Sequence, residues 1–124
     1  MTELITVVES PSFSREAERI LSEWEKTEII SYLAAHPEEG DEIPGTGGLR
    51  KIRFASQQKG KRGGYRAIYF FYNESAPIFL LGVYSKSSQK DLTAEQKRVL
   101  TALTTELKRT LKKRRAGYGN PSNV

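Results

Sequence analysis

A tyrosine and a lysine stand two residues apart at the end of an apolar run, "LLGVYSK" (residues 80–86). Side chains of a strand alternate between its two faces, so Tyr84 and Lys86 are expected to point to the same side of a sheet, together with Gly82 and Leu80. A phenol and an ammonium side by side suit proton transfer and charge stabilisation at a phosphate. The alternative is that a buried strand simply ends here and meets solvent.

Other cations lie on neighbouring predicted strands. Arg66 lies in the aromatic run "YRAIYFFYN" (65–73), where a buried charge is costly unless it is paired or serves a function. "LRKIRF" contributes two cations of one parity, and the turn "GKRGG" contributes two more. If the strand faces coincide, one end of the sheet gathers Lys51, Arg53, Arg66, Tyr84 and Lys86, with Lys61 and Arg62 on an adjacent turn. Alternation does not determine register, so ordinary solvated charges remain the alternative for Lys51, Arg53 and Lys86.

Several kinds of chemistry find no support in the sequence. There is no cysteine, and the one histidine, His36, precedes Pro37 at a predicted helix end without a Ser or Cys partner arrangement. "GTGG" (45–48) lacks the Gly-Lys-Ser/Thr ending of a phosphate-binding loop. The acidic residues of the basic part are too scattered for a two-metal nuclease: Glu74, Asp91, Glu95 and Glu106. No metal and no cofactor are expected, and the basic, aromatic surface suits a polyanion.

The charge is unevenly distributed. Residues 1–44 hold 11 acidic and 3 basic residues, a net charge of −8, whereas residues 45–124 hold 17 basic and 4 acidic ones, a net charge of +13. Such asymmetry indicates interaction with nucleic acid or with an acidic partner. Solvated helix faces of opposite sign are the alternative.

The elements that would position these residues follow from hydrophobic periodicity and capping signals. The chain of 124 residues predicts one domain of the α+β class in the order β–α–α–β–β–β–α. We expect an N-terminal strand, a helical pair or one bent helix, an antiparallel sheet of about four strands, and a C-terminal helix. Capping boxes at Ser22/Glu25 and Thr93/Gln96 predict two helix starts. The domain is expected to span 1–115, followed by a disordered tail at 116–124. No signal peptide or membrane-spanning run is found, which favours the cytoplasm.

Three segments in order carry a resemblance to a known family: "GDEIPGTGGLRKIRFA", "GKRGGYRAIYFF" and "LLGVYSKSSQKDLT". Together they resemble the RelE/ParE superfamily of bacterial toxins, specifically its HigB-like branch, over roughly residues 3–108. The resemblance implies a small RelE-like fold and the toxin of a type II toxin–antitoxin system. It implies a ribosome-dependent, metal-independent mRNA endonuclease that cuts in the A site. The implied partners are a cognate antitoxin, the 70S ribosome and mRNA.

The resemblance also implies roles for residues. Arg66 matches the core-strand arginine, and Tyr84 and Lys86 match the strand-end pair, so these three are the expected catalytic residues. The expected RNA-binding residues are Lys51, Arg53, Lys61 and Arg62. The RNA's own 2′-OH would attack the phosphate, and clustered cations are expected to lower the pKa of Tyr84. Whether Tyr84 or Lys86 is the acid, and whether Tyr84 instead stacks on a base, stays open.

Two other functions remain as alternatives. A ParE-like member would poison DNA gyrase and would not need the Arg66, Tyr84 and Lys86 set. A non-catalytic basic module would bind RNA or the ribosome with steep salt dependence and cut nothing.

Overall fold

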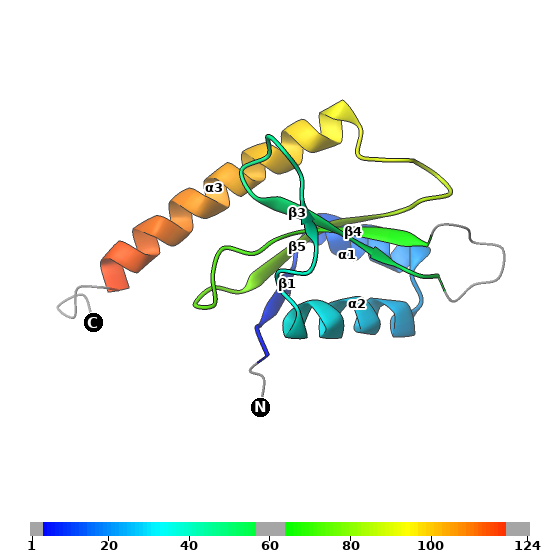
Figure 1. Cartoon of the computed structure of the whole chain (residues 1–124), viewed down its shortest axis with the longest axis horizontal. Coiled ribbons are helices and arrows are strands. Elements are labelled where there is room, and N and C mark those ends of the chain that lie inside the picture. Colours follow the sequence, from blue (N-terminus) through cyan, green and yellow to red (C-terminus); the bar gives the residue numbers. More distant parts are fainter. Residues whose placement is uncertain (1–3, 57–63, 119–124) are drawn as a thin grey trace.

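The computed structural model describes residues 4–56 and 64–118 of the chain, with side chains as far as Lys113. Eight elements follow one another along the chain (Figure 1). They are β1 (Val7–Glu9), α1 (Pro11–Ile20), α2 (Glu23–Ala35), β2 (Asp41–Glu42), β3 (Leu49–Phe54), β4 (Tyr65–Phe70), β5 (Ile78–Ser85) and α3 (Ala94–Tyr118). The predicted α+β class and order of main elements are confirmed.

The strands form one five-stranded sheet in the order β1-β5-β4-β3-β2. The three long strands β3, β4 and β5 are antiparallel neighbours, as their short connections predicted. The sheet exceeds the expected four strands because Asp41–Glu42, in the predicted connector, pairs with β3. β1 pairs with β5 in the parallel direction. This is possible because two helices lie between β1 and the later strands in the chain.

Two helices, and not one bent helix, cover one face of the sheet. α1 ends at Ile20, and Ser22 caps the start of α2. The Ser22 Oγ accepts a hydrogen bond from the Glu25 backbone N–H at 3.0 Å, and the Glu25 carboxylate accepts one from the Ser22 N–H at 2.8 Å. The predicted capping box is therefore confirmed. Buried side chains of both helices pack on the sheet in one hydrophobic cluster with Ile52, Tyr65, Ala67, Tyr69, Ile78, Leu80 and Val83.

α3 crosses the opposite face of the sheet (Figure 1). Its apolar stripe packs on a second cluster that contains Leu49, Ile68, Phe70, Leu81 and Tyr84. The Thr93/Gln96 capping box is present, with Thr93 N–H donating to Gln96 Oε1 at 2.9 Å and Gln96 N–H to Thr93 Oγ1 at 3.0 Å. The helix continues to Tyr118, past residue 116, where we expected the tail to begin. Residues 119–124 of that expected tail lie outside the described residues.

A bulge in β5 changes which residues share a face. Ile68 pairs with Gly82, but the next residue of β4, Tyr69, pairs with Leu80, so Leu81 is an extra residue in the strand. Leu80 consequently packs with the α1–α2 cluster, whereas Leu81 packs with Tyr84 under α3. The expectation that Leu80 shares the face of Tyr84 is therefore wrong, because strict alternation breaks at the bulge.

Candidate active site

Three residues from three adjacent strands form a row across the sheet. Arg53 of β3 pairs with Arg66 of β4, and Arg66 pairs with Tyr84 of β5. Directly opposite residues of antiparallel strands have Cβ atoms about 4.5–5.5 Å apart and point to the same face. The register thus brings two guanidinium groups and a phenol together.

The next row adds a third cation, Lys51, on the same face. Lys51 pairs with Ile68, and Ile68 pairs with Gly82. Lys51 and Arg66 are half-buried, whereas Arg53 is exposed. The coincidence of strand faces that we expected, as a condition for the site, is therefore met for Lys51, Arg53, Arg66 and Tyr84.

A glycine closes the hairpin at the end of this row. Gly64 precedes β4 with φ +62°, and a Cβ added to it would lie 2.0 Å from the carbonyl oxygen of Phe54. Only glycine permits so close an approach of the two strand ends. The Gly64 carbonyl in turn accepts a hydrogen bond from the Lys86 backbone N–H at 3.0 Å, so the ladder between β4 and β5 continues one residue past Ser85.

Lys86 lies just beyond β5 and is half-buried. Its Nζ donates a hydrogen bond to the Lys90 carbonyl, which turns the side chain into the loop that follows the strand. It also lies near enough to Asp91 to act on that carboxylate electrostatically. The ammonium therefore lies in the loop that carries Asp91.

Asp91 links the rows, and our sequence reasoning missed it. Its Oδ1 lies 3.6 Å from Lys51 Nζ and 3.5 Å from the Tyr84 hydroxyl, and accepts a 2.8 Å hydrogen bond from the Leu92 N–H. That backbone hydrogen bond, and then the charges of Lys51 and Lys86, lower the pKa of Asp91, so it is a carboxylate at neutral pH. We had counted Asp91 among scattered acids, because its approach to Tyr84 depends on the path of the 86–91 loop. The aspartate seven residues after the tyrosine was the only available signal.

The expectation of a lowered pKa for Tyr84 is wrong. Burial raises the pKa of Tyr84, and the negative charge of Asp91 raises it further, while Arg66 acts in the opposite direction with a smaller effect. The ring is only 7% exposed, so the phenolate would lose most of its solvation. Tyr84 therefore keeps its proton at neutral pH and can donate it.

The remaining predicted residues are placed as follows. Lys61 and Arg62 lie outside the described residues. His36 caps the C-terminal end of α2 on the surface, in agreement with its predicted helix-end position. Within the described ranges, no three His, Cys, Asp or Glu side chains are grouped so that they could hold a metal ion. None of the helices in those ranges is both long and apolar enough to pass through a bilayer.

Comparison with known proteins identifies a family and a related structure. The model of the family described as the RelE toxin of the RelE/RelB toxin–antitoxin system matches residues 12–116. Among solved structures, the chain is similar to the free state of an Escherichia coli RelE mutant in which two arginines are replaced by alanine. That similarity has a TM-score of 0.52 at 16% identity and covers 70% of this chain and 88% of the RelE chain. It therefore shows a shared fold.

Proposed function

This chain belongs to the RelE family of toxin–antitoxin toxins, and from that membership and the geometry of the site we propose that it is a ribosome-dependent mRNA endonuclease. We propose further that it is a type II toxin of the HigB-like branch, which inhibits translation by cutting mRNA in the ribosomal A site. The observation that carries the proposal is the row Arg53–Arg66–Tyr84, in which adjacent strands present two cations and a protonated phenol.

The row suits a reaction in which RNA supplies its own nucleophile. The 2′-OH attacks the adjacent phosphorus, the bond to the 5′-oxygen of the next nucleotide breaks, and a 2′,3′-cyclic phosphate and a 5′-OH remain. Negative charge builds up on the phosphoryl oxygens in the transition state, and prearranged cations stabilise it. In this proposal Arg66 binds these oxygens with its planar guanidinium, and Arg53 and Lys51 hold the neighbouring backbone. No metal ion is needed for these steps.

The roles in proton transfer are assigned from the protonation state and contacts of the side chains at the site. Because its pKa is raised, Tyr84 holds its proton at neutral pH and is the acid that protonates the leaving 5′-oxygen. Asp91 accepts the Tyr84 hydrogen bond and faces Lys51, so it positions both side chains in this free form of the site. Lys86 contributes positive charge beside them. The proton of the attacking 2′-OH leaves to solvent water.

The partners follow from the family and the proposed reaction. A toxin of this family implies a cognate antitoxin, and the proposed reaction requires the 70S ribosome with mRNA in the A site. We place this reaction in the cytoplasm, where translating ribosomes are found.

The test is primer extension on an mRNA programmed into ribosomes, with a ribosome-free control. The wild type should produce discrete cuts within A-site codons only when ribosomes are present. Arg66→Ala should reduce the rate by about 10²–10³, the usual cost of losing one transition-state donor. Arg15→Ala, which removes an exposed cation from α1, away from the row, should cut like the wild type.

Other outcomes would assign another function. Inhibition of gyrase supercoiling without any RNA cleavage would move the protein to the ParE-like branch. Salt-sensitive ribosome binding without either activity would make it a non-catalytic binding module.

A further inference from the structure

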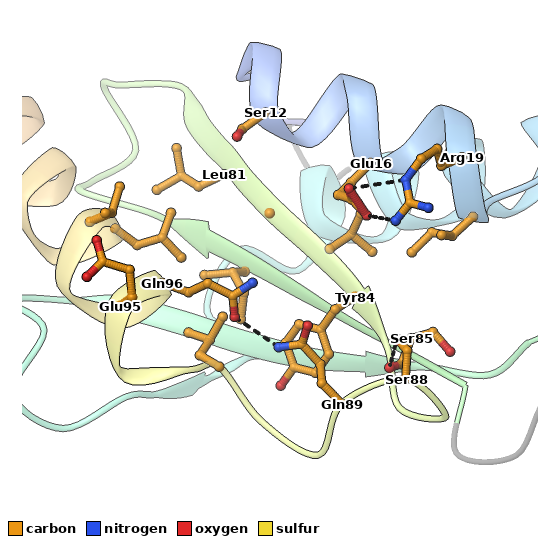
Figure 2. Close-up of a pocket in the computed structure, with 17 residues that line it drawn as sticks. Ser12, Glu16, Arg19, Leu81, Tyr84, Ser85, Ser88, Gln89, Glu95 and Gln96 are labelled. Atoms are coloured by element: carbon orange, nitrogen blue, oxygen red, sulfur yellow. Dashed lines mark hydrogen bonds and ion pairs between the residues drawn. The ribbon is translucent and has the colours of Figure 1, made fainter.

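We propose that a cleft beside Tyr84 binds one nucleobase of the RNA, next to the phosphate that is cut, and gives the enzyme its base preference. The inference rests on the proposed function and deepens it. The cleft has a volume of about 510 Å³ and lies between α1, β5 and the start of α3 (Figure 2). Cavities of roughly 300–1,000 Å³ are typical of small-ligand sites, so a base and its ribose can be accommodated.

The cleft adjoins the catalytic row directly. Tyr84 ends the row Arg53–Arg66–Tyr84 and also lines the cleft. In the proposed complex, a nucleotide whose phosphate lies against Arg66 extends its base past Tyr84, the neighbour of Arg66 on the next strand, into the cleft. Bases of single-stranded RNA are commonly held by stacking on aromatic side chains.

The cleft has a mixed lining of apolar and polar side chains, the latter including the Glu16–Arg19 ion pair and Glu95, and it is open at one point of the sheet. Gly82 has no side chain there, and a Cβ added to it would meet nothing nearer than the Ile68 Cβ at 3.9 Å. Leu81, Leu92 and Leu100 contribute apolar lining. Val99 of α3 also lines the cleft and is 51% exposed, so its side chain is accessible to a ligand. These surfaces suit the flat apolar faces of a base.

Two linked glutamines supply polar groups at the rim. Gln96 Oε1 accepts hydrogen bonds from the Thr93 N–H at 2.9 Å and from Gln89 Nε2 at 2.9 Å. Gln89 Nε2 also donates to the Asp91 carbonyl at 2.8 Å. These contacts orient both amides, because an oxygen must accept and a nitrogen must donate. Figure 2 shows the hydrogen bond between Gln89 and Gln96 among the residues that line the cleft.

The orientation leaves one donor and one acceptor for a ligand. Among the described residues, Gln96 Nε2 and Gln89 Oε1 make no hydrogen bond. An amide donor and an amide acceptor complement an edge that carries both kinds of group, such as the N6 amino group and N7 of adenine, which glutamine recognises in nucleic-acid complexes. We therefore expect selection at one nucleotide next to the cut, with adenine preferred.

The first test compares base preference in ribosome-dependent cleavage. Messages differ only in the base on either side of the scissile phosphate, and four single variants are compared with the wild type. Gln96→Glu keeps the oxygen that caps α3 but replaces the free donor with an acceptor. Gly82→Val fills the open floor of the cleft. Thr105→Ala is the matched control on the exposed side of α3, because within the described part of the chain its hydroxyl bonds only to the Thr101 carbonyl. Arg66→Ala is the catalytic control.

The expected results distinguish an effect on base preference from an effect on the cleavage rate. The wild type should prefer one base about ten-fold or more, in keeping with a bidentate amide–base contact. Gln96→Glu and Gly82→Val should reduce that ratio to within about three-fold or shift it to another base, while Thr105→Ala leaves it unchanged. Arg66→Ala should lower all rates without changing the ratio. An unchanged ratio in both cleft variants would overturn the proposal.

A second measurement does not depend on cleavage. Each of the four ribonucleoside 3′-monophosphates is titrated into the ¹⁵N-labelled protein without ribosomes, and the side-chain amide signals of Gln89 and Gln96 are followed. Saturable shifts that differ between bases and disappear in Gly82→Val would support the site even if the wild type cut no RNA. Absence of shifts would refute it. If the cleft variants weaken antitoxin binding and leave base preference and nucleotide shifts unchanged, the cleft serves the protein partner and the proposal is wrong.

Discussion

Replacing Tyr84 with phenylalanine should abolish most of the activity and leave the fold intact. The ring is 7% exposed and packs in the cluster under α3 with Ile68 and Leu81. Phenylalanine keeps this ring and removes only the hydroxyl. The substitution therefore separates the chemical role of the residue from its packing role.

The substitution Tyr84→Phe should have a small effect on stability and a large effect on the rate of cleavage. Among the described residues, the hydroxyl makes one hydrogen bond, to Asp91 Oδ1 at 3.5 Å, which is long for an O–H···O bond. Its loss should change the free energy of unfolding by less than about 1 kcal/mol. Loss of a general acid, in contrast, should slow cleavage by about 10²–10⁴. Tyr84→Ala would not separate the roles, because emptying an aromatic site in a core costs about 3–5 kcal/mol.

Two assays on the same preparations check the prediction. Urea unfolding followed by tryptophan fluorescence should give nearly the same midpoint for Tyr84→Phe and the wild type. Single-turnover cleavage on programmed ribosomes should show the loss in rate. Cleavage within a few-fold of the wild type would refute the assignment of Tyr84 as the acid and leave it a stacking or packing role. A large fall in the unfolding midpoint would show that the hydroxyl holds the fold, contrary to our reasoning.

Three further predictions concern the surroundings of the site and the fold. Asp91→Asn should lower the pKa of Tyr84, because it removes a negative charge that disfavours the phenolate; ultraviolet or NMR titration would measure this, and an unchanged pKa would show that burial acts alone. Ser22→Ala should destabilise the protein by about 1 kcal/mol in urea unfolding through loss of the N-cap of α2, and no change would contradict the role of the cap. Gly64→Ala should destabilise it by more than about 1 kcal/mol, because φ is +62° and the new Cβ would meet the Phe54 carbonyl oxygen; a stability equal to the wild type would mean that the strand ends separate easily.

The local elements could be predicted because their causes are local. Ser22 with Glu25, and Thr93 with Gln96, form capping boxes within four residues of sequence, and both helices start there. Strands β3, β4 and β5 follow β-branched and aromatic runs with short connections, which made antiparallel neighbours the natural arrangement. The short strand β2 was missed because two acidic residues in a glycine-rich connector carry no strand pattern.

The sequence by itself determined which types of residue are available at the site, where the helices start, and the opposite net charges of the two halves of the chain. These features depend on the residues themselves and on their neighbours in the chain. Only the tertiary structure decided the register that aligns Arg53, Arg66 and Tyr84. It also decided the bulge at Leu81 and the loop that brings Asp91 to Tyr84. The physical reason is that the alternation of side chains does not determine which residue of one strand pairs with which residue of the next. A bulge or the path of a loop is selected by packing between distant segments. The raised pKa of Tyr84 has the same origin, because burial under α3 is a property of the folded chain alone.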